Sequence, residues 1–150
     1  VRNQSYLVES ILDITKLVAA GTFSAVTNGD IFQVLEIPAG TVVIAAGAEV
    51  LTVMSGTSVT VDIDFAAGDD IVDGGDTSST GYLASGTNGG ANEPSATTYT
   101  HFQSTTDTID VKFIAGSSDV TSGVLRVYAV CCDLNGVADT ATEVDRDQLA

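Results

Sequence analysis

The chain has 150 residues and a mass of 15.3 kDa, and its 20 acidic residues against 5 basic ones give a formal net charge of −15. Nucleic acid and anionic membranes present negative groups that so few cations do not neutralise. The charge therefore excludes nonspecific binding to either and favours basic, neutral or metallic partners.

The N-terminal segment fits two kinds of element. Leu7 and Ile14 lie on one stripe of a helix, whereas Val8 and Leu12 fit one face of a strand. Elsewhere the chain is rich in Val, Ile and Thr, which favour strands. We therefore expect a strand at residues 5–12, at the start of an all-β chain.

Two strands are predicted next. Residues 31–37 form a dense apolar run that ends at a Pro-Ala-Gly sequence, and residues 41–46 continue as Thr-Val-Val-Ile-Ala-Ala until Gly47 interrupts them. Proline and glycine end strands and form turns. The pattern thus predicts two strands joined by a turn.

A hairpin is predicted between residues 49 and 65. Residues 49–55 have strand character, and the following Gly-Thr-Ser is typical of a turn. In residues 58–65, Val61 and Ile63 alternate with aspartates, which indicates a half-buried strand. We expect the two strands to pair directly with each other.

A long polar interval, residues 66–106, predicts a loop insertion rich in Gly, Ser, Thr and Asp. Its larger apolar side chains lie at residues 81–83 and 97–102, which we expect to pack back onto the domain. Residues 85–95 are then left as a surface excursion.

Two further strands follow, at residues 108–113 and 123–133, because both segments alternate apolar and polar side chains. The adjacent Cys131 and Cys132 are expected to be free thiols, since neighbours on a strand point to opposite faces. Residues 136–150 are polar and acidic and predict a C-terminal arm beyond a single domain at residues 1–135. The alternation predicts a core of Phe32, Val34, Ile44, Val53, Val61, Ile63, Phe65, Ile109, Val111, Phe113, Leu125 and Val127.

Acidic residues gather in and after the strand at 58–65. Carboxylate oxygens converging on one region are the ligands that Ca²⁺ prefers. The spacing lacks the EF-hand register and the glycine-rich calcium repeat, so a solvated acidic turn without any cofactor stays open as the alternative. The candidate calcium ligands are Asp62, Asp64, Asp69, Asp70, Asp73 and Asp76.

Catalytic motifs are missing from the sequence. It has one histidine, His101, and neither a Gly-x-Ser-x-Gly elbow nor a His-Glu-x-x-His motif, so we expect no enzyme. Tyr82, Tyr99 and Tyr128 are candidates for a sugar-binding platform, which keeps a carbohydrate-binding module open. No apolar stretch is long enough for a membrane span and no signal-peptide pattern is present, so we expect synthesis in the cytoplasm.

Four segments, taken in chain order, carry a family resemblance. They are GDIFQVLEIPAGTVV at 29–43, SVTVDI at 58–63, TDTIDV at 106–111 and SGVLRVYAV at 122–130. Across about residues 11–133 this order resembles the small β-sandwich virion structural proteins of tailed bacteriophages, a group that includes capsid decoration (cement) proteins.

The resemblance implies a fold and a role. The fold is an antiparallel, jelly-roll-like β-sandwich, to which the polar composition of this chain adds a long loop insertion and extended termini. The role is to decorate the outer capsid surface of the virion, as a homotrimer bound to the major capsid protein and made in the host cytoplasm, with no catalytic residues. The insertion at 85–95 has no counterpart in that pattern, so a tail or head-fibre component stays open.

Overall fold

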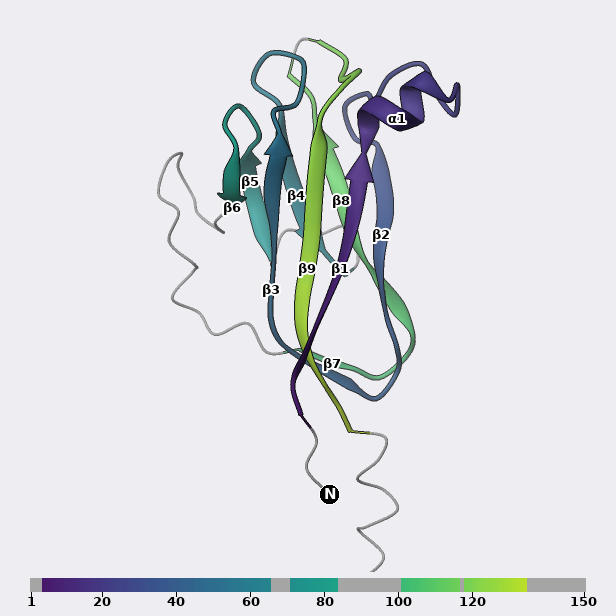
Figure 1. The fold of residues 1–150 in the computed structure, drawn as a ribbon, viewed down its shortest axis with the longest axis vertical. Coiled ribbons are helices and arrows are strands. Elements are labelled where there is room, and N and C mark those ends of the chain that lie inside the picture. Colours follow the sequence, from purple (N-terminus) through teal and green to yellow (C-terminus); the bar gives the residue numbers. More distant parts are fainter. Residues whose placement is uncertain (1–3, 66–70, 84–100, 117, 135–150) are drawn as a thin grey trace, which may run out of the picture.

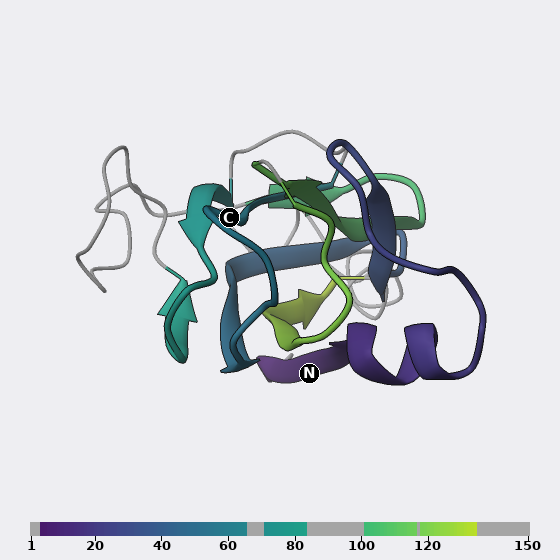
Figure 2. The ribbon, with the colours of Figure 1, turned by 90° about the horizontal axis from the view of Figure 1, so that it is seen from above.

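The computed structural model describes residues 4–65, 71–83, 101–116 and 118–134. Within these residues, strands form two antiparallel sheets that pack face to face, and Figure 1 shows them running along the long axis of the molecule. Seen from above, the sheets lie as two layers, with one short helix beside the end of β1 (Figure 2). The expected all-β sandwich is confirmed.

The elements follow one another along the chain with a single helix among the described residues. They are β1 (Tyr6–Asp13), α1 (Ile14–Ala19), β2 (Ile31–Ile37), β3 (Thr41–Thr52), β4 (Thr60–Asp64), β5 (Val72–Asp76), β6 (Gly81–Leu83), β7 (His101–Gln103), β8 (Asp107–Ile114) and β9 (Val124–Asp133).

The strand order is that of a jelly roll. One sheet has the order β1-β9-β3-β6, with β7 also paired to β3, and the other has the order β2-β8-β4-β5. β1 therefore pairs with β9, β2 with β8, β3 with β6 and β7, and β4 with β5. A long antiparallel hairpin rolled into two sheets gives this nested pairing.

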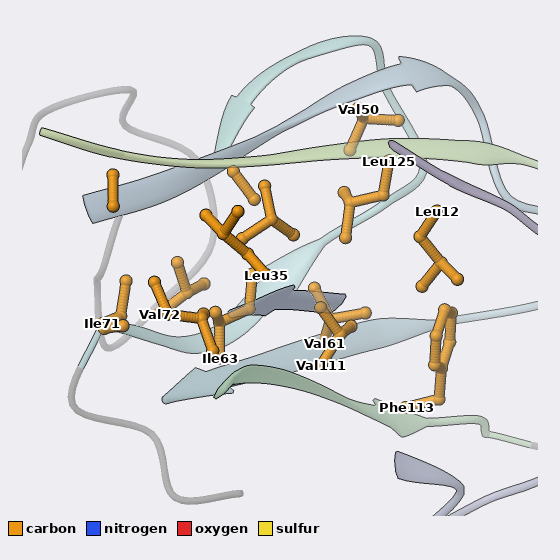
Figure 3. Close-up of a cluster of buried hydrophobic side chains, with 14 of the residues drawn as sticks. Leu12, Leu35, Val50, Val61, Ile63, Ile71, Val72, Val111, Phe113 and Leu125 are labelled. Atoms are coloured by element: carbon orange, nitrogen blue, oxygen red, sulfur yellow. The ribbon is translucent and has the colours of Figure 1, made fainter. Parts of the chain in front are cut away.

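The core lies between the two sheets. Val50, Leu125 and Leu12 extend from one sheet toward Val61 and Phe113 of the other (Figure 3). Eight predicted core residues are buried, and two more, Phe32 and Val34, are partly buried against the core. The eight are Val61, Ile63, Phe65, Ile109, Val111, Phe113, Leu125 and Val127.

The two remaining core predictions, Ile44 and Val53, are wrong, because both side chains are exposed. The pairing of β3 with β9 shifts register between Val43 and Ala45, and Ile44 is the extra residue of this irregularity. A bulge of this kind reverses which residues face the core. Val53 lies beyond the end of β3, and Met54 is buried in its place.

Gly47 does not end a strand, contrary to the prediction, and residues 41–52 form the single strand β3. Gly47 lies opposite Tyr128 of β9. A Cβ atom at this position would come within 2.7 Å of the Tyr128 hydroxyl oxygen, so the missing side chain makes room for the tyrosine ring. This glycine therefore serves packing between strands and not a turn.

The predicted hairpin at residues 49–65 is also wrong. β3 belongs to one sheet and β4 to the other, so the turn at residues 56–58 passes between the sheets. The long interval contains β5, β6 and β7, and the latter two pair with opposite ends of β3. Residues 85–95 and 136–150 lie outside the described residues.

The N-terminal strand is confirmed as β1, although the chain continues directly into α1. Asp13 caps the helix, because its carboxylate accepts a hydrogen bond from the Lys16 backbone N–H at 2.9 Å. Ile14 is fully buried and anchors the helix to the end of the sandwich. Of the two residues on the helical stripe of the sequence, Ile14 lies in the helix, whereas Leu7 belongs to β1.

Candidate interaction surfaces

The outer face of the β2-β8-β4-β5 sheet is acidic. On β4 and β8 the apolar side chains Val61, Ile63 and Val111 point inward, which leaves the intervening polar residues on the outer face. Lys112 of β8 lies among them and forms an ion pair with Asp62, with 3.8 Å between Nζ and Oδ2. The carboxylates of this acidic face belong to Glu36, Asp62, Asp64, Asp73 and Asp110.

The predicted calcium ligands are only partly brought together. Asp62 is occupied by Lys112 and also accepts the Gly74 backbone N–H at 3.0 Å. Asp76 accepts hydrogen bonds from the Ser78 backbone N–H and hydroxyl at 2.8 and 2.9 Å, which closes a local turn. These contacts engage carboxylate oxygens that a cation would need.

The other candidate ligands are dispersed or outside the described residues. Asp73 is exposed on β5 and Asp64 lies on β4, while Asp69 and Asp70 fall in the gap at residues 66–70. Among the residues described, no group of three or more His, Cys, Asp or Glu side chains has an arrangement that could hold a metal ion. The calcium site stays an untested prediction.

Asp110 is the buried carboxylate of the acidic face, and the sequence analysis missed it as a site. It lies between Gln33 of β2 and Asp64 of β4, and its side chain is only 8% exposed. Burial raises the pKa of Asp110, the 2.6 Å hydrogen bond from the Thr108 hydroxyl opposes the rise, and Asp107 adds to it. Because Asp110 alternates with inward residues in the sequence, it was predicted to lie on a solvated face. Nothing in the sequence indicates how strongly its neighbours cover it.

The outer face of the β1-β9-β3-β6 sheet is apolar. Directly paired residues of antiparallel strands lie on the same face of a sheet. One such row joins Leu7, Val130 and Ala45, and another joins Phe102, Val42 and Cys132. We use the name apolar face for the outward residues Leu7, Ile11, Val42, Ala45, Tyr82, Phe102, Val124, Tyr128, Val130 and Cys132, together with the charged residues Glu9, Glu49 and Arg126.

The charges on the apolar face are paired with each other. Arg126 of β9 forms an ion pair with Glu9 of β1 at 3.5 Å and a hydrogen-bonded ion pair with Glu49 of β3. Desolvation lowers the pKa of Arg126, but the two glutamates outweigh it and hold the pKa above its usual value. The guanidinium therefore stays charged and ties three strands together.

Two tyrosines meet on the apolar face, Tyr128 from the central strand β9 and Tyr82 from the edge strand β6. Tyr128 lies over Gly47, and its ring meets the Tyr82 ring edge to face, with centroids 6.2 Å apart. Burial first, and then the neighbouring Tyr82 and Glu49, raise the pKa of the Tyr128 hydroxyl. The structure thus brings together two of the three tyrosines considered as a sugar platform, while Tyr99 lies outside the described residues.

His101 and the cysteines show no catalytic arrangement within the described residues. The His101 ring stacks on Phe65 with centroids 4.5 Å apart and contacts the Gln103 side-chain oxygen at 2.9 Å. Cys131 is buried and Cys132 partly exposed, and both are free thiols as expected. Burial raises the pKa of Cys131, which makes its thiol a poor nucleophile.

Comparison with known proteins gave one structural likeness. No family profile matches the chain, and no curated protein sequence matches it. It is similar to a chain of the acidic stable capsid structure of Helicobacter pylori bacteriophage KHP30, with 16% identity, a TM-score of 0.43, and coverage of 87% of this chain and 90% of that one. In the described part of this chain, no helix has the length and apolar character to cross a membrane.

Proposed function

We propose that the chain is a non-enzymatic structural protein of a tailed-bacteriophage virion, which decorates and stabilises the outer capsid surface as a homotrimer. The observation that carries the proposal is the division of the outer surface into an acidic and an apolar face. A small protein that holds capsid subunits together needs one surface for its own copies and another for the capsid protein. The jelly-roll sandwich implied by the family resemblance, and confirmed by the strand order, supports the same role.

The acidic face is the surface that we assign to the major capsid protein. A protein with a net charge of −15 gains electrostatic energy from a basic partner. The acidic face places Glu36, Asp62, Asp64, Asp73 and Asp110 on the outer side of one sheet, with Lys112 among them. Because most of these carboxylates are exposed or partly exposed, their attraction to a basic patch is screened by salt. Binding to heads is therefore expected to weaken as ionic strength rises.

The experiment is a binding assay of the purified protein on capsids that lack it, at several salt concentrations. Asp73→Lys reverses a charge on the acidic face, and Asp119→Lys reverses another exposed charge in the loop before β9. We expect the first variant to bind about tenfold more weakly, equivalent to about 1.4 kcal/mol, and the second to bind nearly as the wild type does. Equal loss in both variants, or a wild type that does not bind capsids, would refute the assignment.

Location within the virion is tested separately. Antibody labelling of intact virions is expected to mark the head surface in many copies. Labelling confined to the tail or to the base of a head fibre would replace decoration with the other virion role left open by the sequence.

A carbohydrate-binding module is the second candidate, favoured by the edge-to-face pair of Tyr82 and Tyr128. Exposed aromatic rings provide apolar surface for the apolar face of a sugar. Tyr82 is 57% exposed, so it is the ring that a sugar would contact first. Glycan binding by the wild type that is lost in Tyr82→Ala, together with no binding to capsids, would favour this function over decoration.

A further inference from the structure

We infer that the apolar face of the β1-β9-β3-β6 sheet binds a second copy of this chain. The inference deepens the proposed function and rests on the self-association proposed there, because it names the surface through which copies meet. The contact is made by outward side chains on the face of the sheet, because the strands of this sheet already pair with one another.

Exposure of large apolar side chains is concentrated on this face. Leu7, Ile11, Tyr82 and Phe102 are 60%, 51%, 57% and 55% exposed, and they come from β1, β6 and β7 on both sides of the central strands. Between them lie half-buried residues such as Val130, which pairs with Leu7. These apolar residues surround the ion-paired Arg126 and Glu49 of the central strands. An exposed apolar surface of this size is typical of a protein interface.

The strand β9 itself has the composition of a strand that is covered on both sides. Its inward residues, from Leu125 to Cys131, are buried in the core. Its outward residues are Val124, Arg126, Tyr128, Val130 and Cys132, of which only one is charged. Strands that read as nearly continuous apolar runs are normally buried on both faces, whereas a solvated outer face gives clear alternation.

Charge decides between a second copy and other partners. Two chains of net charge −15 repel each other, so copies associate most readily through the surface with the smaller net charge. On the apolar face, Arg126 is paired with Glu9 and Glu49 within the same chain, which leaves one uncompensated negative charge. The acidic face, with Asp62, Asp64 and Asp110 on adjacent strands, lacks this balance and suits a basic partner.

The chain's own remaining segments do not fit this face by composition. Residues 135–150 contain Asp139, Glu143, Asp145 and Asp147, and would bring further negative charge onto an apolar surface. Residues 84–100 are mostly Gly, Ser, Thr, Asn and Ala, with Tyr99 as the one aromatic residue. A second copy, in contrast, offers a matching set of Leu, Ile, Val and Tyr side chains.

The experiment measures association of the purified full chain by sedimentation equilibrium, without capsids. The chain offers a matched pair of variants, Ile11→Asp and Ile31→Asp. Both isoleucines are 51% exposed, and each lies opposite a cation on the neighbouring strand, Arg126 for Ile11 and Lys112 for Ile31. They differ in position, because Ile11 is on the apolar face and Ile31 is on β2 of the other sheet.

We expect a discrete oligomer for the wild type, a dissociation constant at least about 100-fold larger for Ile11→Asp, and a change within about threefold for Ile31→Asp. Circular dichroism checks that each variant is folded, and Leu7→Asp, on the same face, replaces Ile11→Asp if that variant unfolds. A wild type that is monomeric at about 100 μM, or equal dissociation of the two variants, would overturn the inference.

The same data separate this inference from the proposed function. A dimer that Ile11→Asp dissociates would support the face and contradict the trimer. An oligomer that Ile11→Asp dissociates but that does not bind capsids would support the face and refute decoration.

Discussion

The two sheets of the sandwich are alike on their inner faces and differ on their outer ones. Both inner faces carry aliphatic and aromatic side chains that meet in one core (Figure 3). The outer face of one sheet presents carboxylates such as Asp62 and Asp73, whereas the outer face of the other presents Leu7, Ile11 and Phe102. Folding requires only the inner faces to be apolar, so the second apolar surface needs another explanation, and association with a partner supplies it.

The largest loss of stability is expected when a charged side chain is placed on one of the apolar inner faces. Ile63→Asp places an unpaired carboxylate at a fully buried position, which costs several kcal/mol against a total stability of about 5–15 kcal/mol. We expect this variant not to fold, while Ile11→Asp, on an outer face, stays folded. Circular dichroism and thermal melts measure both; a soluble Ile63→Asp with an unchanged melting temperature would show that the core is misassigned.

The next largest loss of stability is expected on the apolar face, where two neighbouring tyrosines differ in burial. Tyr128→Ala removes a half-buried ring that covers Gly47 and contacts Tyr82. We expect a loss of about 1–3 kcal/mol, below the cost of truncating a fully buried aromatic residue. Tyr82→Ala, which truncates the more exposed partner, is the control and should cost less in the same denaturant titration. If both variants lose equal stability, Tyr128 does not support the sheet through Gly47.

The alternation in the sequence predicted the strands best where the two faces differ in polarity. In β4 and β8, aspartates alternate with Val61, Ile63 and Val111, so the core face was assigned correctly. In β3 the run Val-Val-Ile-Ala-Ala has no polar residue to mark a face, and a bulge reverses the alternation at Ile44. Apolar residues on both sides of a strand therefore hide its register from sequence reasoning.

The connections between strands were harder to predict than the strands. The turn chemistry at residues 56–58 is the same whether a turn closes a hairpin or passes between sheets, and here it passes between sheets. Similarly, the covering of Asp110 depends on Gln33 and Asp64, which come from strands distant in sequence. Local patterns carry no information about such neighbours.

A smaller effect is expected from Asp110→Asn on the acidic face. Burial raises the pKa of Asp110 in the folded state above its ordinary value of 3.8, so the charged form is disfavoured by folding. Its contribution to stability therefore falls as pH rises from 3.8 through the raised pKa. The variant should melt at a higher temperature than wild type at pH 7, and this advantage should vanish below pH 3.8, where both states of the wild-type side chain are protonated.

Asp62→Asn is the matched control for that measurement. It removes a carboxylate of the same face that is paired with Lys112, whereas the Asp110 carboxylate accepts a hydrogen bond from Thr108. Loss of a partly exposed ion pair costs about 0–1 kcal/mol, so this variant should melt at the same or a slightly lower temperature at pH 7. A rise of equal size in both variants would mean that general charge repulsion, and not the burial of Asp110, is responsible.

The smallest effect concerns removal of a metal ion from the predicted calcium ligands. Asp62 is engaged by Lys112 and Gly74, and Asp76 by Ser78, so these carboxylates already have partners without a cation. A ligand that binds only the folded state raises the melting temperature by mass action. We therefore expect the same melting temperature with excess chelator and with millimolar Ca²⁺ at fixed ionic strength. A calcium-dependent rise that is lost in Asp62→Asn but kept in Asp119→Asn would instead establish the calcium site at Asp62.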